Sequence, residues 1–159
     1  MDVVNLFDAV VPDPDESRPD GFRRGALQLG PRLGASRIGA TLYEIPPGER
    51  LSPYHYEYNN EEWVLVVEGR PTLRTPDDER ELCPGDVVAF PVGPDGAHGV
   101  ANQTDELVRV VMLSTKREPR VAAYPDSDKL AVWRLGGDER DELIVKRSST
   151  TDYWDGEAG

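Results

Sequence analysis

Short runs rich in β-branched and aromatic residues recur along residues 25–115, and clusters of Pro, Gly, Asp and Asn separate them. Between Ala26 and Thr115 the apolar residues do not keep the three- and four-residue spacing of an amphipathic helix, which argues against an α/β fold. The alternation of short runs and turn signals instead predicts an all-β antiparallel sandwich or barrel. We expect strands at residues 38–45, 63–67, 72–75, 86–90 and 107–114.

Segments of different character flank this β-rich region. The chain has 159 residues, enough for one domain with one core. Residues 1–24 carry three prolines among acidic residues and little periodicity, so we interpret them as an N-terminal arm. Residues 25–115 are expected to form the barrel, and residues 116–159 a C-terminal extension.

The C-terminal extension contains two further candidate strands, at residues 129–134 and 142–147. A Gly136-Gly137 loop joins them, so they predict an appended hairpin. Large aromatic side chains follow near the C-terminus, and they would be unusual in a free tail. We therefore expect the extension to dock on the barrel or on a second subunit.

Charge and cysteine content exclude several classes of partner. The chain has 30 acidic and 18 basic residues, and its net charge of −12 repels nucleic acids and anionic membranes. No apolar run is long enough to span a membrane, and the N-terminus does not resemble a signal peptide. The single Cys83 cannot form an internal disulfide, and we expect it to be buried and inert. These features favour a cytoplasmic protein.

Candidate metal ligands crowd into the segment from residue 48 to 69, which reads GERLSPYHYEYNNEEWVLVVEG. His55 and Glu57 are two positions apart and therefore face the same side of a strand. An Asn-Asn turn then reverses the chain and brings Glu62 alongside them. Alternation places Glu61 on the opposite, solvated face.

The other histidine of the chain, His98, lies in a second glycine-punctuated segment, GDVVAFPVGPDGAHGVAN, at residues 85–102. A barrel that brings the two segments together would present two imidazoles and one or two carboxylates at one point. Such nitrogen and oxygen donors suit Mn, Fe, Ni, Co or Zn. The alternative is a metal-free barrel in which both imidazoles are hydrogen-bonded to protein groups.

These two segments resemble the paired motifs of the cupin superfamily. The first motif runs Gly, a spacer, His-x-His, a short turn, Glu, six residues and Gly. The second runs Gly, five residues, Pro-x-Gly, a spacer, His, three residues and Asn. The matching positions are Gly48, His55, Glu62 and Gly69 in the first motif and Gly85, Pro91, Gly93, His98 and Asn102 in the second. The spacer before His98 is two residues longer than usual.

The resemblance implies a double-stranded β-helix, or jelly-roll, barrel that holds one divalent metal ion and pairs as a homodimer. Glu57 stands where the family most often has the second histidine. One possibility is that Glu57 is a fourth ligand, which adds negative charge to the site. The other is that His55, Glu62 and His98 form a two-histidine, one-carboxylate triad, with Glu57 as a general base.

Two functions from different classes fit such a site. The first is a metal-dependent enzyme, an isomerase or a dioxygenase, that acts on a small oxygen-rich metabolite such as a sugar derivative or an organic acid. The second is a non-catalytic module that binds or senses a small molecule. Aromatic residues near the motifs are expected to pack in the core or at the rim of the barrel: Tyr54, Tyr56, Tyr58, Trp63 and Phe90.

Overall fold

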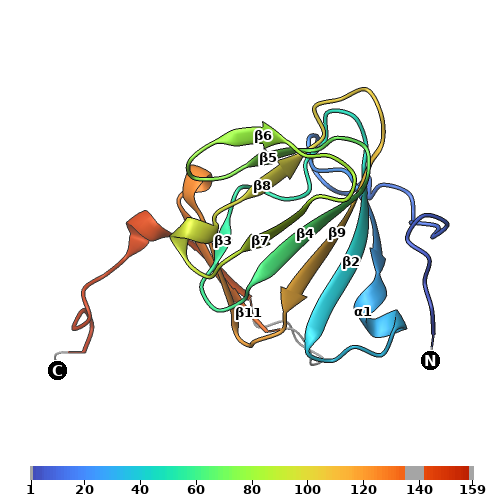
Figure 1. Cartoon of the computed structure of the whole chain (residues 1–159). Coiled ribbons are helices and arrows are strands. Elements are labelled where there is room, and N and C mark those ends of the chain that lie inside the picture. Colours follow the sequence, from blue (N-terminus) through green and yellow to red (C-terminus); the bar gives the residue numbers. More distant parts are fainter. Residues whose placement is uncertain (1, 135–141, 158–159) are drawn as a thin grey trace.

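The computed structural model describes residues 2–134 and 142–157, which fold as a jelly-roll β-barrel of antiparallel sheets (Figure 1). The sheets have the strand orders β1-β2-β9-β4-β7, β12-β11-β10-β3 and β6-β5-β8. The strands are β1 (Gly25–Gln28), β2 (Ile38–Ile45), β3 (Tyr56–Glu57), β4 (Glu62–Glu68), β5 (Thr72–Arg74), β6 (Glu79–Glu81), β7 (Val87–Phe90), β8 (Gly99–Ala101), β9 (Val108–Thr115), β10 (Arg120–Tyr124), β11 (Lys129–Trp133) and β12 (Glu142–Lys146).

Helical structure in the described residues is limited to single turns. These are α1 (Leu29–Arg32) and the 3-10 turns η1 (Pro94–Gly96), η2 (Pro125–Ser127) and η3 (Arg147–Ser149). None of these helices has the length and apolar character needed to cross a lipid bilayer.

The main core lies inside the barrel, between the five-stranded and three-stranded sheets. Alternate residues of β4 and β9 point inward, because successive side chains of a strand face opposite sides. Val64 and Val66 of β4 and Val108 and Val110 of β9 are at most 1% exposed. They pack with apolar residues of the other strands and turns: Ile45, Leu51, Leu73, Leu82, Phe90 and Val100.

A second apolar cluster covers the outer face of the five-stranded sheet. Leu42 of β2 and Val111 of β9 pack there against Val11 and Leu29, together with other apolar residues of the N-terminal segment. The side chain of Arg109 anchors that segment, because its guanidinium donates hydrogen bonds to backbone carbonyls of residues 7 and 9. Residues 2–24 thus form no strand or helix but pack along the barrel wall.

The C-terminal part of the chain contributes a sheet to the barrel. β10 pairs with β3, so that Ala122 lies opposite Glu57. β11 and β12 continue the same sheet outward as an antiparallel hairpin. The Gly136-Gly137 loop predicted to join them lies outside the described residues. This pairing brings β10 directly alongside the first motif.

The all-β, antiparallel prediction is confirmed, and each strand expected from the sequence is present within one or two residues of its expected bounds. Five short strands were not among those expected: β1, β3, β6, β8 and β10. They are two to five residues long and lack a strong alternation of apolar and polar residues, so the sequence signal was weak.

Some predictions for single side chains were wrong. Cys83 is exposed, because its backbone N–H binds the Asp86 carboxylate in a turn and the thiol points outward. Trp63 is 41% exposed on the outer face of β4, where its indole N–H donates to Glu61. The C-terminal aromatics lie away from the barrel of their own chain, and their docking on a second subunit stays a prediction. They are largely exposed and pack against each other on a segment that extends away from the body (Figure 1).

Candidate metal centre

His55 and His98 lie opposite each other across a two-residue antiparallel bridge. The backbone N–H of His98 donates to the carbonyl oxygen of His55 at 2.8 Å, and the N–H of His55 donates in return at 3.1 Å. Residues paired in this way project their side chains to the same face of the sheet. The two imidazole rings therefore meet inside the barrel, with their centroids 4.8 Å apart.

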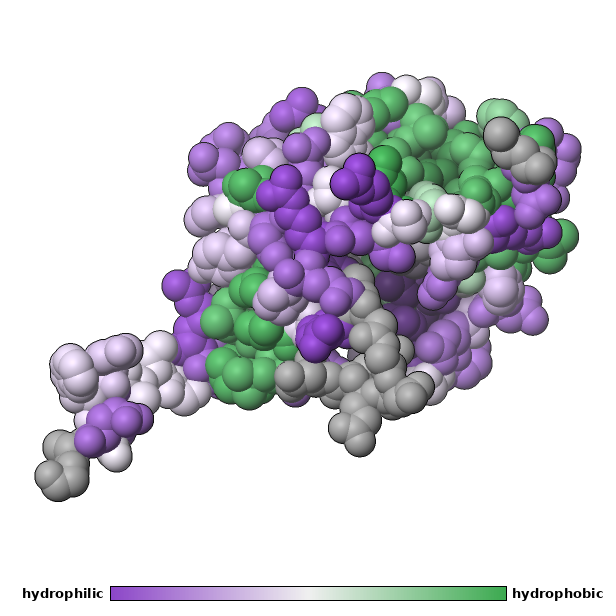
Figure 2. All heavy atoms as spheres, turned by 90° about the horizontal axis from the view of Figure 1, so that it is seen from below, coloured by the Kyte–Doolittle hydropathy of each residue, from purple (hydrophilic) through white to green (hydrophobic). Residues whose placement is uncertain are grey.

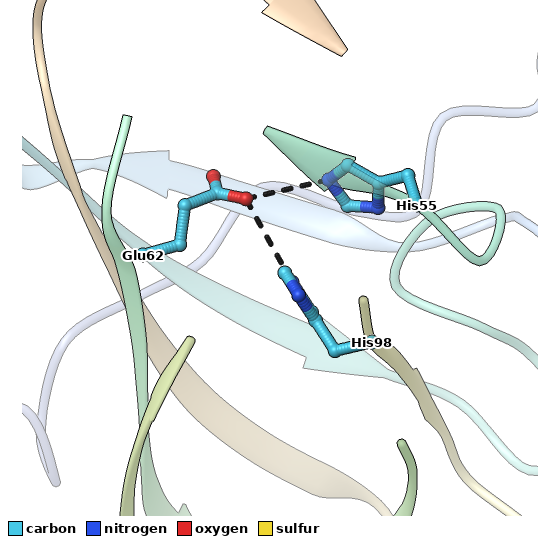
Figure 3. Close-up of side chains that lie close together, drawn as sticks. All are labelled: His55, Glu62 and His98. Carbon is cyan, nitrogen blue, oxygen red and sulfur yellow. Dashed lines mark ion pairs between the residues drawn. The ribbon is translucent and has the colours of Figure 1, made fainter. Parts of the chain in front are cut away.

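Glu62, the first residue of β4, places its carboxylate between the two rings (Figure 3). Its Oε2 atom lies 3.4 Å from Nε2 of His55 and 3.7 Å from Nε2 of His98. All three side chains are buried. One ligand atom from each residue lies within 4.8 Å of the others, so the three residues form a cluster that could hold a metal ion.

Backbone carbonyls fix how the two imidazoles are turned. Nδ1 of His55 lies 2.9 Å from the carbonyl oxygen of Pro53, and Nδ1 of His98 lies 2.9 Å from that of Gly96. A carbonyl oxygen only accepts, so each Nδ1 must carry the proton and donate it. In the neutral ring the Nε2 atom then presents a lone pair, and both lone pairs face Glu62.

This arrangement sets hydrogen-bond acceptors against one another in a buried space. Burial lowers the pKa of His98 to about 4, and the positive charge of Arg120 acts in the same direction, so the His98 ring is neutral at pH 7. Burial would raise the pKa of Glu62, but the pKa is lowered overall, and the nearby positive charge of Arg120 contributes to that lowering. Oε2 of Glu62 and Nε2 of His98 have no hydrogen-bond partner. A cation between these atoms would satisfy all of them.

The donor set fits a divalent metal ion. Nitrogen and oxygen ligands bind such ions at roughly 2.0 to 2.2 Å, which places neighbouring ligand atoms about 3 to 3.5 Å apart. The two distances from Glu62 to the imidazoles are close to this range. A backbone carbonyl that accepts the Nδ1 proton is also typical of metal-binding histidines. Two histidines and one carboxylate leave coordination positions for other ligands.

Glu57 lies next to this cluster but is not part of it. Its Oε1 accepts a hydrogen bond of 2.7 Å from Nε of Arg120, and it is 3% exposed. Burial raises the pKa of Glu57 in spite of the Arg120 charge. Its Oε2 atom is buried without a hydrogen-bond partner. The sequence offered Glu57 as a fourth ligand or as a general base, and in the structure its carboxylate lies against the guanidinium of Arg120.

Arg120 and Tyr124 of β10 lie beside the cluster, and neither residue was predicted from the sequence. Arg120 also donates to Oε1 of Glu62 at 3.2 Å, and the Trp133 ring covers its guanidinium at 5.1 Å. Tyr124 stacks on the ring of His55, with centroids 5.7 Å apart. The available signal was the spacing of Arg120, Ala122 and Tyr124, which places them on one face of a strand.

Phe90, which the sequence assigned to packing, covers the other imidazole. Its ring stacks on that of His98 with a centroid distance of 3.7 Å and an interplanar angle of 7°. The side chain of Phe90 is 4% exposed. The aromatic wall excludes water from one side of the site and restricts the orientation of the His98 ring.

A separate groove of about 510 Å³ lies on the outer face of the three-stranded sheet. It is lined in part by Tyr54 and Gly99, which adjoin His55 and His98 in sequence. Because neighbouring residues of an extended chain face opposite sides, this groove does not contain the metal cluster. It is a surface feature distinct from the candidate metal centre.

Comparison with known families settles the classification. The cupin domain profile matches residues 41–114. The structure also resembles a sugar phosphate isomerase of the cupin superfamily from Silicibacter pomeroyi, at 27% identity and a TM-score of 0.77, over 97% of this chain and 98% of that chain. This chain is a cupin. The prediction of family from the paired motifs is confirmed.

Other solved structures are similar to a smaller part of the chain. A candidate sugar phosphate isomerase from Acidithiobacillus ferrooxidans is 28% identical, with a TM-score of 0.74, over 83% of this cupin and 81% of that chain. The polyketide cyclase RemF from Streptomyces resistomycificus is 25% identical, with a TM-score of 0.60, over 76% and 83% of the two chains. No curated protein sequence matches this cupin.

The family profile spans the residues of the candidate metal cluster but not the whole site. His55, Glu62 and His98 lie within residues 41–114, whereas Arg120 and Tyr124 lie beyond them. The similarity to the Silicibacter pomeroyi structure extends over 97% of the chain and therefore includes β10. The C-terminal sheet is thus part of the architecture that surrounds the site of this cupin.

Proposed function

We propose that this cupin is a metal-dependent isomerase of a small phosphorylated sugar. Support comes from the opposed acceptors of His55, Glu62 and His98, which call for a cation, and from two similar structures that bear the names of sugar phosphate isomerases. The opposed acceptors are the observation that supports a bound metal ion. The names of the two similar structures are the basis for proposing a sugar phosphate as the substrate.

His55, Glu62 and His98 would hold the ion through Nε2, Oε2 and Nε2. A bound divalent ion supplies Lewis acidity, which polarises a sugar carbonyl or hydroxyl group. The carbonyls of Pro53 and Gly96 keep both imidazoles in the tautomer that can bind a metal ion. Phe90 and Tyr124 hold the ring planes in place by stacking.

Glu57 is the proposed general base of the reaction. An aldose-ketose isomerisation removes a proton from one carbon and returns it to the neighbouring carbon, so the base must both accept and release that proton. Glu57 has a pKa raised by burial, which strengthens it as a base, and its Oε2 has no other hydrogen-bond partner. Arg120 fixes the other oxygen and so positions the carboxylate.

The test combines metal analysis with proton exchange. The purified cupin is loaded with Mn, Fe, Ni, Co or Zn, its metal content is measured, and it is incubated with aldose and ketose phosphates in D₂O. The proposal predicts about one ion per chain and deuterium in the product at the carbon that exchanges its proton. A matched pair of variants separates the roles: Glu57→Gln keeps the metal and loses exchange, and Glu61→Gln keeps both.

Two outcomes would contradict the proposal. If the Glu57→Gln variant still converts substrate, Glu57 is not the general base. A metal-loaded protein that gains thermal stability with a sugar phosphate, yet neither converts it nor exchanges its proton, would identify a binding or sensor module instead.

A further inference from the structure

β12 is the outermost strand of its sheet, and it is exposed along its full length. Its central residues are Leu143, Ile144 and Val145, which are 56%, 54% and 37% exposed. Edge strands are usually protected from pairing by charges, prolines or bulges, since an unpaired edge invites another strand. Three consecutive aliphatic residues offer no such protection.

The strand is apolar on both faces, as an interior strand would be. In the β11–β12 register Leu143 lies opposite Val132, and Val145 lies opposite Leu130, so these four residues share one face. Ile144 lies opposite Ala131 and points to the other face. Figure 2 shows hydrophobic atoms gathered beside the base of the projecting C-terminal segment, where the β11–β12 hairpin lies. Burial of the apolar side chains on both faces of β12 against another chain would therefore be favourable.

The sequence of β12, Glu-Leu-Ile-Val-Lys, is complementary to its own reverse. When two copies run antiparallel about Ile144, Glu142 lies opposite the partner's Lys146, and Leu143 lies opposite the partner's Val145. Cross-strand pairs of opposite charge and of aliphatic residues both stabilise an antiparallel ladder. Moving the register by one or two residues separates Glu142 from the partner's Lys146, so the charges select one alignment.

We propose that two copies of this chain associate through antiparallel pairing of β12 with β12, about a two-fold axis at Ile144. The sheets β12-β11-β10-β3 of the two copies then form one continuous sheet. The interface is isologous, because each copy presents the same strand. Lys146 donates a hydrogen bond to the carbonyl oxygen of Ser127, which leaves its positive charge to be balanced by a carboxylate.

The test measures the mass of the full chain in solution by light scattering or sedimentation over a range of concentrations. The wild type is expected at twice the chain mass of 17.6 kDa. Ile144→Lys places two ammonium groups together on the axis and should raise the dimer dissociation constant at least about tenfold. Val10→Lys, at a position that is 86% exposed on the N-terminal segment, makes the same change elsewhere and should leave the mass unaltered.

Charge reversal tests the register itself. Glu142→Lys and Lys146→Glu each place like charges opposite one another and should weaken the dimer several-fold. The double variant E142K/K146E restores opposite charges and should return the dissociation constant to within about twofold of the wild type. Each single variant changes only an exposed side chain, so we expect both variants to fold normally. Circular dichroism checks this and distinguishes a folding defect from a loss of pairing.

Oxidative cross-linking gives an independent measurement. In a Cys83→Ser background, Ile144→Cys brings two identical thiols to the axis and should cross-link readily, whereas Leu143→Cys faces the partner's Val145 and should cross-link much less. A monomer at all concentrations would overturn the proposal. A dimer that is indifferent to Ile144→Lys, or a double charge reversal that fails to recover pairing, would overturn it as well.

Discussion

Arg120 and the buried Glu57 form a partly buried ion pair across 63 positions of sequence, with Nε of the arginine 2.7 Å from Oε1 of the glutamate. The same guanidinium reaches Oε1 of Glu62 at 3.2 Å. One cation on β10 therefore balances two carboxylates that come from the first motif. This contact ties the C-terminal sheet to the candidate metal centre.

Removing Arg120 should destabilise the protein strongly. Arg120→Ala would leave the Glu57 carboxylate buried without its cation, and breaking a buried pair in this way costs about 3 to 5 kcal/mol. Urea unfolding of the chelator-treated protein measures the loss. Arg134→Ala removes an exposed pair with Glu118 and should cost less than about 1 kcal/mol.

A double variant isolates the cause of that loss. Arg120→Ala leaves the Glu57 carboxylate without a cation, and Glu57→Gln removes that negative charge. R120A/E57Q should therefore be more stable than R120A alone. A double variant that is as unstable as the sum of the two single changes would show that Arg120 acts through packing instead.

Protonation of His98 should contribute to the pH dependence of the free energy of unfolding. Its pKa in the folded protein is about 4, against 6.5 for a free histidine. Between these values the unfolded chain binds a proton that the folded chain does not, so the free energy of unfolding falls as the pH is lowered from 6.5 towards 4. From pH 7 to pH 5 the expected loss from this group is about 2 kcal/mol.

A matched variant separates His98 from the other titrating groups. His98→Gln cannot take up the proton, so the difference in stability between metal-free wild type and His98→Gln should shrink by that amount between pH 7 and pH 5. A difference that stays constant across this range would mean that His98 titrates normally and is not enclosed as described.

Two motif glycines should differ in their tolerance of alanine. Gly48 and Gly69 have similar positive φ angles of 79° and 75°, which cost a side chain about 1 to 2 kcal/mol. A Cβ atom on Gly48 would meet nothing within 4 Å, whereas on Gly69 it would lie 2.6 Å from the carbonyl oxygen of Leu107. Gly69→Ala should therefore lower the free energy of unfolding by at least about 2 kcal/mol more than Gly48→Ala. Equal losses in urea unfolding would contradict the close approach.

The sequence predicted the barrel well where local patterns are strong. The β2, β4 and β9 strands combine β-branched residues with turn signals at both ends, and each is present. Strand alternation also predicted correctly that Glu61 faces solvent and that Glu62 faces the interior. Motif spacing was enough to bring His55, Glu62 and His98 into one cluster.

The sequence could not reveal the part of the site that depends on long-range pairing. Arg120 and Tyr124 follow the segment in which the family motifs end, and only the register of β10 against β3 turns them towards Glu57 and His55. A strand of Arg-Val-Ala-Ala-Tyr carries no signal for its partner. The exposure of Cys83 was likewise missed because a turn, and not burial, fixes the orientation of its backbone.

Anomalous diffraction from crystals grown with a divalent transition metal tests the central claim most directly, because it locates the ion and its ligands together. We predict one peak per chain, roughly 2.0 to 2.2 Å from Nε2 of His55, Nε2 of His98 and a carboxylate oxygen of Glu62. A metal-supplemented crystal with no peak at that point, and with the two imidazoles and Glu62 bridged by ordered water, would contradict the account.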